Sequence, residues 1–435
     1  MKSLKLFFSI YAVAIFIVLI ITGIYFDRYF TKLTPSTEEI DLSYPFSKFF
    51  ISIRPQSDSM GPATFVFRND LSRQGVIFDG DLNFPMEQVW QTKSFNIGVH
   101  SASKSSPAVD QTGIYLGSDA GWFFRYSADG KMQWRFRISG TTQGIHGTAA
   151  LDDQFVYFSG YNGILYKAKK LTGEIVWLRK MADAIGSSVL LSSEFMYVSC
   201  ETNERNGYIA KLRRDSGEIV WKSRWLLEQI HSSPTLSTDR SIVYVGTNAG
   251  NLHAFNAVSG EELWAYNAKG PIKGTAIAYD NKVAFTSWGD TITALDQHSG
   301  KLIWNNNLNI RSQSSPSYVS DTLIFSAYDK IKNVGNIFAV NAKTGITKWK
   351  IPSTGTLIGS TLSIYSKKAK TWISWTGCRN SKLCGIQSTN GKILQEIELG
   401  GGLTGSPTYF QNKLYVNVFL GGLMQFTERS ALPNK

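Results

Sequence analysis

Residues 241–264 read SIVYVGTNAGNLHAFNAVSGEELW and contain most of one structural repeat. Two short runs of β-branched and aromatic residues, SIVYVG and NLHAF, are separated by the turn TNAG. A second turn, AVSG, leads into a strand that carries Trp264, and another short run precedes the unit at residues 235–237. Such runs between Gly, Asn and Ser clusters predict four antiparallel strands joined by tight turns.

The end of this unit recurs along the chain. A glycine in a polar turn is followed four residues later by tryptophan, or once by glutamine. The glycines are Gly130, Gly173, Gly217, Gly260, Gly300, Gly345 and Gly391. The residues four places on are Trp134, Trp177, Trp221, Trp264, Trp304, Trp349 and Gln395. The intervals of 40 to 46 residues between glycines are typical of the four-stranded blades of a β-propeller. Residues 65–430 contain no amphipathic helical pattern that would favour a helical repeat.

The number of blades depends on the two ends of the repeat region. Seven complete repeats are followed by an eighth, which opens at Thr404 and stops after residue 426 without a fourth strand. Residues 85–92 (PMEQVWQT) carry Trp90 with no strands ahead of it, so this segment can complete the last blade and leave no open sheet edge. We therefore predict an all-β, eight-bladed propeller of four-stranded antiparallel blades, with seven blades as the alternative.

The repeated tryptophans are expected to be structural anchors between blades, because a large flat ring can cover the turn of a neighbouring blade. The predicted anchors are Trp90, Trp134, Trp177, Trp221, Trp264, Trp304 and Trp349. None of them is expected to be catalytic.

The N-terminus carries an uncharged segment, residues 6–26. Its 21 residues at about 1.5 Å rise span about 30 Å, the thickness of the bilayer hydrocarbon, and predict one N-terminal transmembrane helix. A cleavable signal peptide is the alternative, but residues 22–28 offer no small-residue cleavage site and no cysteine nearby supports a lipid anchor. Lys2 and Lys5 before the span favour a cytoplasmic N-terminus and a propeller in the periplasm. The predicted parts are a membrane anchor at 1–26, a stalk at 27–64, the propeller at 65–430 and a tail at 431–435.

The cysteines and the net charge each leave alternatives open. Cys378 and Cys384 bracket a five-residue loop between two strands of the seventh repeat and predict a hairpin disulfide, with two reduced thiols as the alternative. The formal charge of +12 favours anionic lipids, acidic glycans or acidic proteins as partners, although solubility also explains it. The chain has no recognisable nucleic-acid-binding motif, so nucleic acid is not an expected partner.

Several repeats resemble a known family. Segments such as GNLHAFNAVSG at 250–260 and GNIFAVNAKTG at 335–345, followed by the Gly-x-x-x-Trp ending, resemble pyrroloquinoline-quinone (PQQ)-type propeller repeats. The resemblance covers residues 65–430, and FVFRNDLSRQG at 65–75 resembles the beginning of free-standing members. It implies the fold, whereas the functions of members range from quinone-dependent dehydrogenases to scaffolds such as the propeller lipoprotein of the outer-membrane β-barrel assembly machinery.

Equivalent positions near the axis are the candidate site. Each repeat opens with a short triplet of small residues, such as SSP at 232–234 or GTA at 274–276, on the strand expected to line the channel. The residues just before these triplets are Lys104, His146, Gly186, His231, Lys273, Gln313, Ile358 and Thr404. We predict that Lys104, His146, His231, Lys273 and Gln313 form a ligand-binding ring for an anion or a polar polymer at the channel mouth. A water-filled channel that tolerates polar residues is the alternative, and no third ligand supports a zinc site.

A PQQ-dependent dehydrogenase would require specific cofactor-binding and catalytic residues in addition to the propeller fold. The resemblance implies that quinone-dependent members carry adjacent cysteines beside the cofactor, calcium ligands and a catalytic Asp. No two cysteines are adjacent here, and the other groups map to no matching motif. We therefore predict no catalytic residue, metal or cofactor, with PQQ and calcium as the alternative.

These observations together predict a periplasmic propeller held in the inner membrane by a single pass. We expect a non-enzymatic scaffold or binding subunit of a cell-envelope complex, which recognises an envelope protein through inter-blade loops and strand edges. Loops such as 201–206 and 329–333 are expected to vary this surface. The alternatives are a binder of an anionic glycan or another anion at the channel mouth and a PQQ-dependent dehydrogenase.

Overall fold

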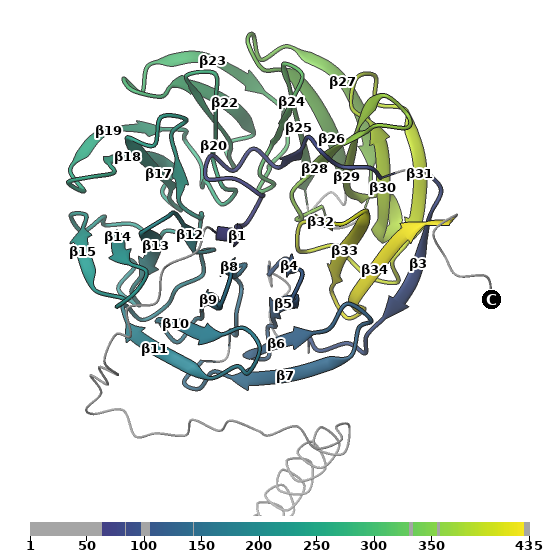
Figure 1. Ribbon diagram of the computed structural model, residues 1–435. Coiled ribbons are helices and arrows are strands. Elements are labelled where there is room, and N and C mark those ends of the chain that lie inside the picture. Colours follow the sequence, from purple (N-terminus) through teal and green to yellow (C-terminus); the bar gives the residue numbers. More distant parts are fainter. Residues whose placement is uncertain are drawn as a thin grey trace, which may run out of the picture. The chain divides into compact units, whose positions relative to one another are not determined.

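Eight sheets stand around a central axis, as expected for a propeller (Figure 1). The computed structural model describes residues 63–82, 84–96, 105–141, 143–329, 334–354 and 357–429, all within one unit of the chain, residues 40–435. Each sheet contains a blade of four antiparallel strands in which neighbours in space are mostly neighbours in sequence. The prediction of eight four-stranded blades is confirmed.

The blades follow one another in sequence, and their strands have the following bounds. Blade 1 contains β4 (Ala108–Asp110), β5 (Gly113–Gly117), β6 (Trp122–Tyr126) and β7 (Met132–Arg137), and blade 2 contains β8 (Ala150–Asp152), β9 (Phe155–Ser159), β10 (Ile164–Lys169) and β11 (Ile175–Lys180). Blade 3 contains β12 (Leu190–Leu191), β13 (Phe195–Glu201), β14 (Gly207–Arg213) and β15 (Ile219–Lys222), and blade 4 contains β16 (Thr235–Leu236), β17 (Ile242–Gly246), β18 (Asn251–Asn256) and β19 (Glu262–Asn267). Blade 5 contains β20 (Ile277–Tyr279), β21 (Lys282–Thr286), β22 (Thr291–Asp296) and β23 (Leu302–Asn307), and blade 6 contains β24 (Ser317–Val319), β25 (Thr322–Asp329), β26 (Val334–Asn341) and β27 (Thr347–Ser353). Blade 7 contains β28 (Leu362–Ser366), β29 (Thr371–Cys378), β30 (Lys382–Gln387) and β31 (Ile393–Glu398), with the short 3₁₀-helix η1 (Arg379–Ser381) between β29 and β30.

The last blade joins the two ends of the propeller. It contains β32 (Thr408–Phe410), β33 (Lys413–Val418), β34 (Gly422–Glu428) and the N-terminal strand β3 (Met86–Gln91). β3 pairs antiparallel with β34, and Figure 1 shows the purple and yellow strands side by side. Pairing of the predicted N-terminal segment with the incomplete eighth repeat therefore closes the ring and covers the strand edge of β34.

The repeated tryptophans connect consecutive blades. Each indole packs against the turn glycine of the following blade, and its Nε1 donates to a backbone carbonyl of that turn at 2.9 to 3.4 Å. The pairs are Trp90–Gly130, Trp134–Gly173, Trp177–Gly217, Trp221–Gly260, Trp264–Gly300, Trp304–Gly345 and Trp349–Gly391. Gly300 shows why the turn needs glycine, because its φ is +67° and an added Cβ would lie 2.5 Å from Trp264 Cδ2.

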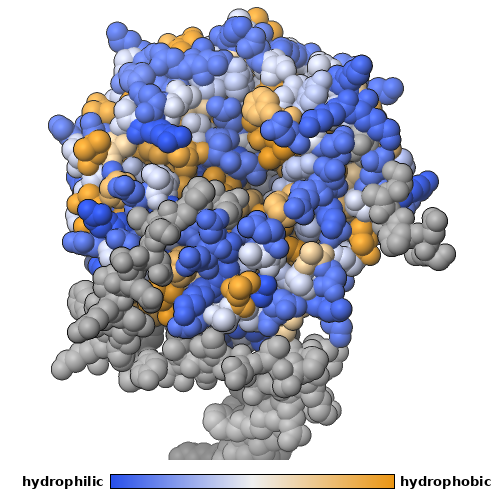
Figure 2. All heavy atoms as spheres, in the orientation of Figure 1, coloured by the Kyte–Doolittle hydropathy of each residue, from blue (hydrophilic) through white to orange (hydrophobic). Residues whose placement is uncertain are grey.

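The apolar core lies between neighbouring blades. One cluster joins Tyr157 and Leu165 of blade 2 to Val198 and Tyr208 of blade 3, all of them buried. The face shown in Figure 2 is mostly hydrophilic, with apolar residues dispersed among polar ones. Most of the apolar strand residues therefore hold blade against blade instead of facing solvent.

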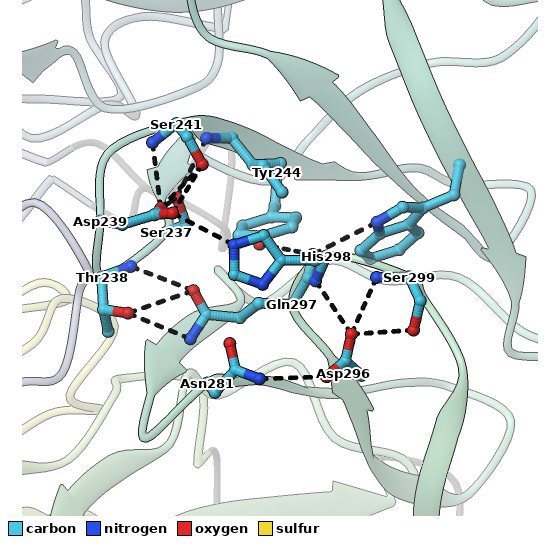
Figure 3. Close-up of polar contacts among 12 residues, drawn as sticks. Ser237, Thr238, Asp239, Ser241, Tyr244, Asn281, Asp296, Gln297, His298 and Ser299 are labelled. Atoms are coloured by element: carbon cyan, nitrogen blue, oxygen red, sulfur yellow. Dashed lines mark hydrogen bonds and ion pairs between the residues drawn. The ribbon is translucent and has the colours of Figure 1, made fainter.

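Polar turns add further contacts between blades (Figure 3). In blades 4 and 5 the N–H of Thr238 donates to Gln297 Oε1 at 3.0 Å, and His298 Nε2 lies 3.1 Å from Asp239 Oδ2. The carbonyl of Gln297 also accepts the indole N–H of Trp264 at 3.2 Å. This turn thus contacts the preceding blade through side chains and backbone together.

The N-terminal segment before β3 crosses the inner strands. β1 (Ala63–Phe65) pairs with β8 of blade 2, and β2 (Val76–Ile77) pairs in parallel with β28 of blade 7. Between them, carbonyls of this segment accept backbone N–H groups from the inner strands of blades 4, 5 and 6. The segment thereby follows the wall of the channel, and it begins two residues before the predicted propeller boundary at residue 65.

The other terminal predictions fall outside the described residues. These are the membrane anchor at 1–26, nearly all of the stalk and the tail at 431–435. Within the described ranges, no helix has the length and apolar character needed to cross a membrane. Cys378 and Cys384 form a disulfide, with Cα atoms 5.9 Å apart, and Cys200 is a buried free thiol.

Candidate functional site

The positions just before the inner strands line a single axial cavity of about 420 Å³, counting its open mouth. Seven of the eight aligned positions contribute to its wall. They are His146, Gly186, His231, Lys273, Gln313, Ile358 and Thr404. The eighth position, Lys104, lies outside the described residues. The alignment of repeats therefore brought together residues that are up to 258 positions apart in sequence, His146 and Thr404.

A ring of hydroxyl groups lies two residues further along each blade. In seven of the eight blades, the backbone N–H of this Ser or Thr donates to the hydroxyl oxygen of the equivalent residue in the next blade, at 2.8 to 3.2 Å. The ring consists of Ser106, Thr148, Ser188, Ser233, Thr275, Ser315, Ser360 and Ser406. Six of these residues, all but Ser106 and Thr148, also line the cavity.

This ring was missed from the sequence, although the signal was present. The second residue of every opening triplet is Ser or Thr, as in SSP at 232–234 and GTA at 274–276. Small polar residues in that place align the repeats without indicating by themselves that their hydroxyls form a ring. These bonds explain the repetition, because seven of the eight hydroxyls accept an N–H of the preceding blade that would otherwise be buried without a partner.

Cationic and aromatic side chains surround the mouth. Lys273 Nζ lies 4.2 Å from the ring centre of Trp288, and the guanidinium of Arg311 lies 5.8 Å from the same ring. The rings of His146 and Tyr161 are 4.3 Å apart. Burial lowers the pKa of Lys273, and the negative charge of Glu201 opposes this shift. The indole stabilises the neighbouring cations through its negative face.

Glu201 is the acidic residue beside this site. The predicted surface loop 201–206 was wrong at its first residue, because Glu201 belongs to β13 and is buried. Its carboxylate Oε1 lies 3.2 Å from Nδ1 of His231. The carboxylate therefore faces a cavity-lining histidine and not a partner surface.

The opposite end of the cavity is closed by the N-terminal segment. Phe67 forms part of the wall, and the buried guanidinium groups of Arg68 and Arg73 donate to backbone carbonyls of the inner strands. Arg68 reaches Thr361 and Arg73 reaches Pro234, each at 3.2 Å. Burial lowers the pKa of both arginines while Asp70 opposes the shift, and both remain protonated at neutral pH. The channel is thus a blind pocket.

The donor set does not fit the calcium of the enzyme alternative. Calcium takes six to eight oxygen ligands, among them carboxylates. In the ranges that the structure describes, no group of three or more His, Cys, Asp or Glu side chains could hold a metal ion. Lysine, histidine and hydroxyl groups instead give the cavity mostly hydrogen-bond donors.

Comparisons with known proteins identify relatives of two kinds. A family described as outer membrane protein assembly factor BamB matches residues 86–204 and 205–377. A protein of that name from Shewanella oneidensis is 23% identical over 287 residues, which cover 60% of this chain and 68% of the relative. The Salmonella typhimurium protein of the same name is 27% identical over 169 residues, covering 36% of this chain and 40% of the relative. The quinoprotein ethanol dehydrogenase of Pseudomonas aeruginosa is 27% identical over 132 residues, which cover 26% of this chain and 21% of that enzyme.

Solved structures show the same fold. The structure of BamB from Moraxella catarrhalis has a TM-score of 0.61 and 19% identity, and the match covers 79% of this chain and all of that one. A europium-containing methanol dehydrogenase has a TM-score of 0.67 and 13% identity, covering 82% of this chain and 89% of the enzyme. At these identities the structural likeness establishes architecture alone.

Proposed function

Because the chain belongs to the family described as outer membrane protein assembly factor BamB, we propose that it is a non-enzymatic scaffold or binding subunit of a cell-envelope complex. The family model covers both the first and the later blades, whereas the match to the quinoprotein ethanol dehydrogenase covers about a quarter of the chain. The fold suits the role, because a closed ring of eight blades presents loops on a rigid frame.

A surface feature supports protein binding. In the connection between β15 and β16, the side chains of Trp225 and Leu227 are 56% and 83% exposed, while Leu226 between them is buried. Trp225 is held edge-on against Tyr208 with ring centres 5.0 Å apart, so its position is fixed although half of it faces solvent. A fixed, exposed tryptophan beside an exposed leucine is typical of the anchors at protein interfaces.

We also propose that the chain is anchored in the inner membrane. Residues 6–26 would anchor the chain in the inner membrane and leave the propeller in the periplasm, which raises its concentration near envelope partners. The support is the uncharged length of the segment. Alkaline carbonate extraction of membranes and protease access to the propeller in spheroplasts test it, and release of the chain by carbonate would contradict it.

The central experiment is a crosslinked pull-down of the full-length chain from solubilised membranes, followed by mass spectrometry. We expect a stoichiometric envelope protein with the wild type and a large loss of it with W225A/L227S. Val258→Ser is the matched control, because Val258 is 78% exposed but lies at the other end of the outer strands of the neighbouring blade. Recovery of the wild-type chain without a partner would overturn the scaffold proposal. Equal capture of the envelope protein by the wild type, W225A/L227S and V258S would exclude Trp225 and Leu227 from the binding surface.

A further inference from the structure

The axial cavity offers a separate binding site that the scaffold role does not use. We infer that it binds an oxyanion, either a small free anion or the terminal phosphate, sulfate or carboxylate group of a larger molecule. The inference goes beyond the proposed function, and it rests on donors, charge and the closed shape of the cavity.

The hydroxyl ring supplies directed donors. Ser188, Ser233, Ser315, Ser360 and Ser406 each accept a backbone N–H at 2.8 to 3.2 Å through the hydroxyl oxygen. In the described part of the chain, none of these five hydroxyls donates to a protein acceptor. A serine hydroxyl that accepts a bond still carries one proton to donate. Because these residues line the cavity, their O–H groups are available to an acceptor at its centre.

Positive charge dominates around this ring. Lys273 lines the cavity, and Arg311 shares the indole of Trp288 with it. At the closed end, Arg68 and Arg73 are fully buried and donate to backbone carbonyls. Two carboxylates oppose these four cations: Asp70 acts on Arg68 and Arg73, and Glu201, which lies 3.2 Å from His231, acts on Lys273. Cations around a cavity with low-dielectric walls focus a positive potential into it, which favours an anion.

The shape limits what can enter. Phe67 and the N-terminal segment close one end, so a polymer cannot pass through the axis. Through its open mouth the cavity can receive a small anion or one terminal group. A free anion, an acidic glycan end and a lipid headgroup share this oxyanion chemistry, and the probes below separate them.

The first test is isothermal titration of the full-length chain in non-ionic detergent with inorganic phosphate, sulfate and acetate at constant ionic strength. We expect saturable binding of at least one anion with one site per chain. Lys273→Met should weaken it about tenfold or more, because a charged hydrogen bond is lost. Lys301→Met is the matched control, since Lys301 is an exposed lysine at the other end of blade 5. No saturable binding up to about 50 mM of any anion, or equal binding by K273M, would overturn the inference.

A second pair of variants tests charge without removing any donor. Ile358 lines the cavity and is half-buried, so Ile358→Glu adds a negative charge there and Ile358→Gln adds a neutral group of the same size. Weaker anion binding by I358E than by I358Q supports the inference, and equal binding contradicts it. Glycerol 3-phosphate and trigalacturonate then distinguish a lipid headgroup from an acidic glycan. Protein capture by K273M should equal that of the wild type, which separates this site from the scaffold role.

Discussion

The side-chain amide of Gln395 makes two hydrogen bonds with the backbone of Met86. Its Oε1 accepts the Met86 N–H at 2.8 Å and its Nε2 donates to the Met86 carbonyl at 2.7 Å. Gln395 occupies the place that tryptophan takes in the other repeats, and Met86 begins β3. This contact with the closing strand is therefore polar, whereas the equivalent contacts between the other blades use an indole against a glycine.

We expect Gln395→Ala to weaken ring closure. Both bonds to a partly buried backbone are lost, which should lower the free energy of unfolding by about 1–3 kcal/mol. Urea denaturation followed by tryptophan fluorescence measures the change. Gln133→Ala is the control, because the Gln133 amide bonds only exposed atoms. A Q395A chain as stable as Q133A would show that β3 is held by its pairing with β34 alone.

A buried ion pair between blades gives the second prediction. Lys170 Nζ of blade 2 lies 2.6 Å from Asp110 Oδ2 of blade 1, and both side chains are about 1% exposed. Lys170→Met leaves a buried carboxylate without its cation and should cost about 3–5 kcal/mol in unfolding free energy. The adjacent Lys169 pairs with Glu174 at the surface, so Lys169→Met should cost about 0–1 kcal/mol. Similar losses for the two variants would contradict this difference.

The contact of Asp239 with blade 5 should depend on pH (Figure 3). Hydrogen bonds from Ser237 first, and also from Ser241 and His298, hold the pKa of Asp239 well below its usual value. A depressed carboxyl pKa contributes stability above its unfolded value of about 3.9, and the contribution is lost as the pH falls below that value. The stability difference between wild type and Asp239→Asn should therefore shrink as the pH falls from 5 towards 2. A difference that stays the same down to pH 2 would contradict this account.

The disulfide of blade 7 should stabilise the chain modestly. It closes a short hairpin, with Cys378 and Cys384 six positions apart. The entropy that it removes from the unfolded chain should therefore stabilise the folded state by less than about 3 kcal/mol. Cys378→Ala/Cys384→Ala should lower the midpoint of thermal unfolding under non-reducing conditions. Adding dithiothreitol should lower the midpoint of the wild type and leave the double variant unchanged, and any further fall in the double variant would point to another cause.

Much of the architecture could be predicted because it is repeated. The Gly-x-x-x-Trp endings mark the joint between blades, and Trp90 without strands before it identifies the closing segment. The alignment of the triplets also placed His146, His231 and Lys273 around one cavity. Repetition makes these inferences possible, because the same local geometry is required in every blade.

The closed end of the channel could not be predicted in this way. Arg68 reaches a carbonyl 293 residues away, Thr361, and Arg73 reaches one 161 residues away, Pro234. Every residue has a backbone carbonyl, so the type of the accepting residue does not reveal that an arginine binds it. Glu201 was placed in a loop for a similar reason, since its partner His231 comes from another blade.

Because β3 pairs with β34, the ring can close only after nearly the whole propeller has been synthesised. The ion pair between Glu87 and Arg429, which flanks this pairing, joins residues 342 positions apart. At typical synthesis rates, the later residue follows the earlier one after tens of seconds. Until then the nascent propeller is an open arc in which β3 lacks its partner and the terminal sheet edges are exposed. Until synthesis reaches β34, these edges are therefore open to pairing with other chains, which makes aggregation a hazard of this topology.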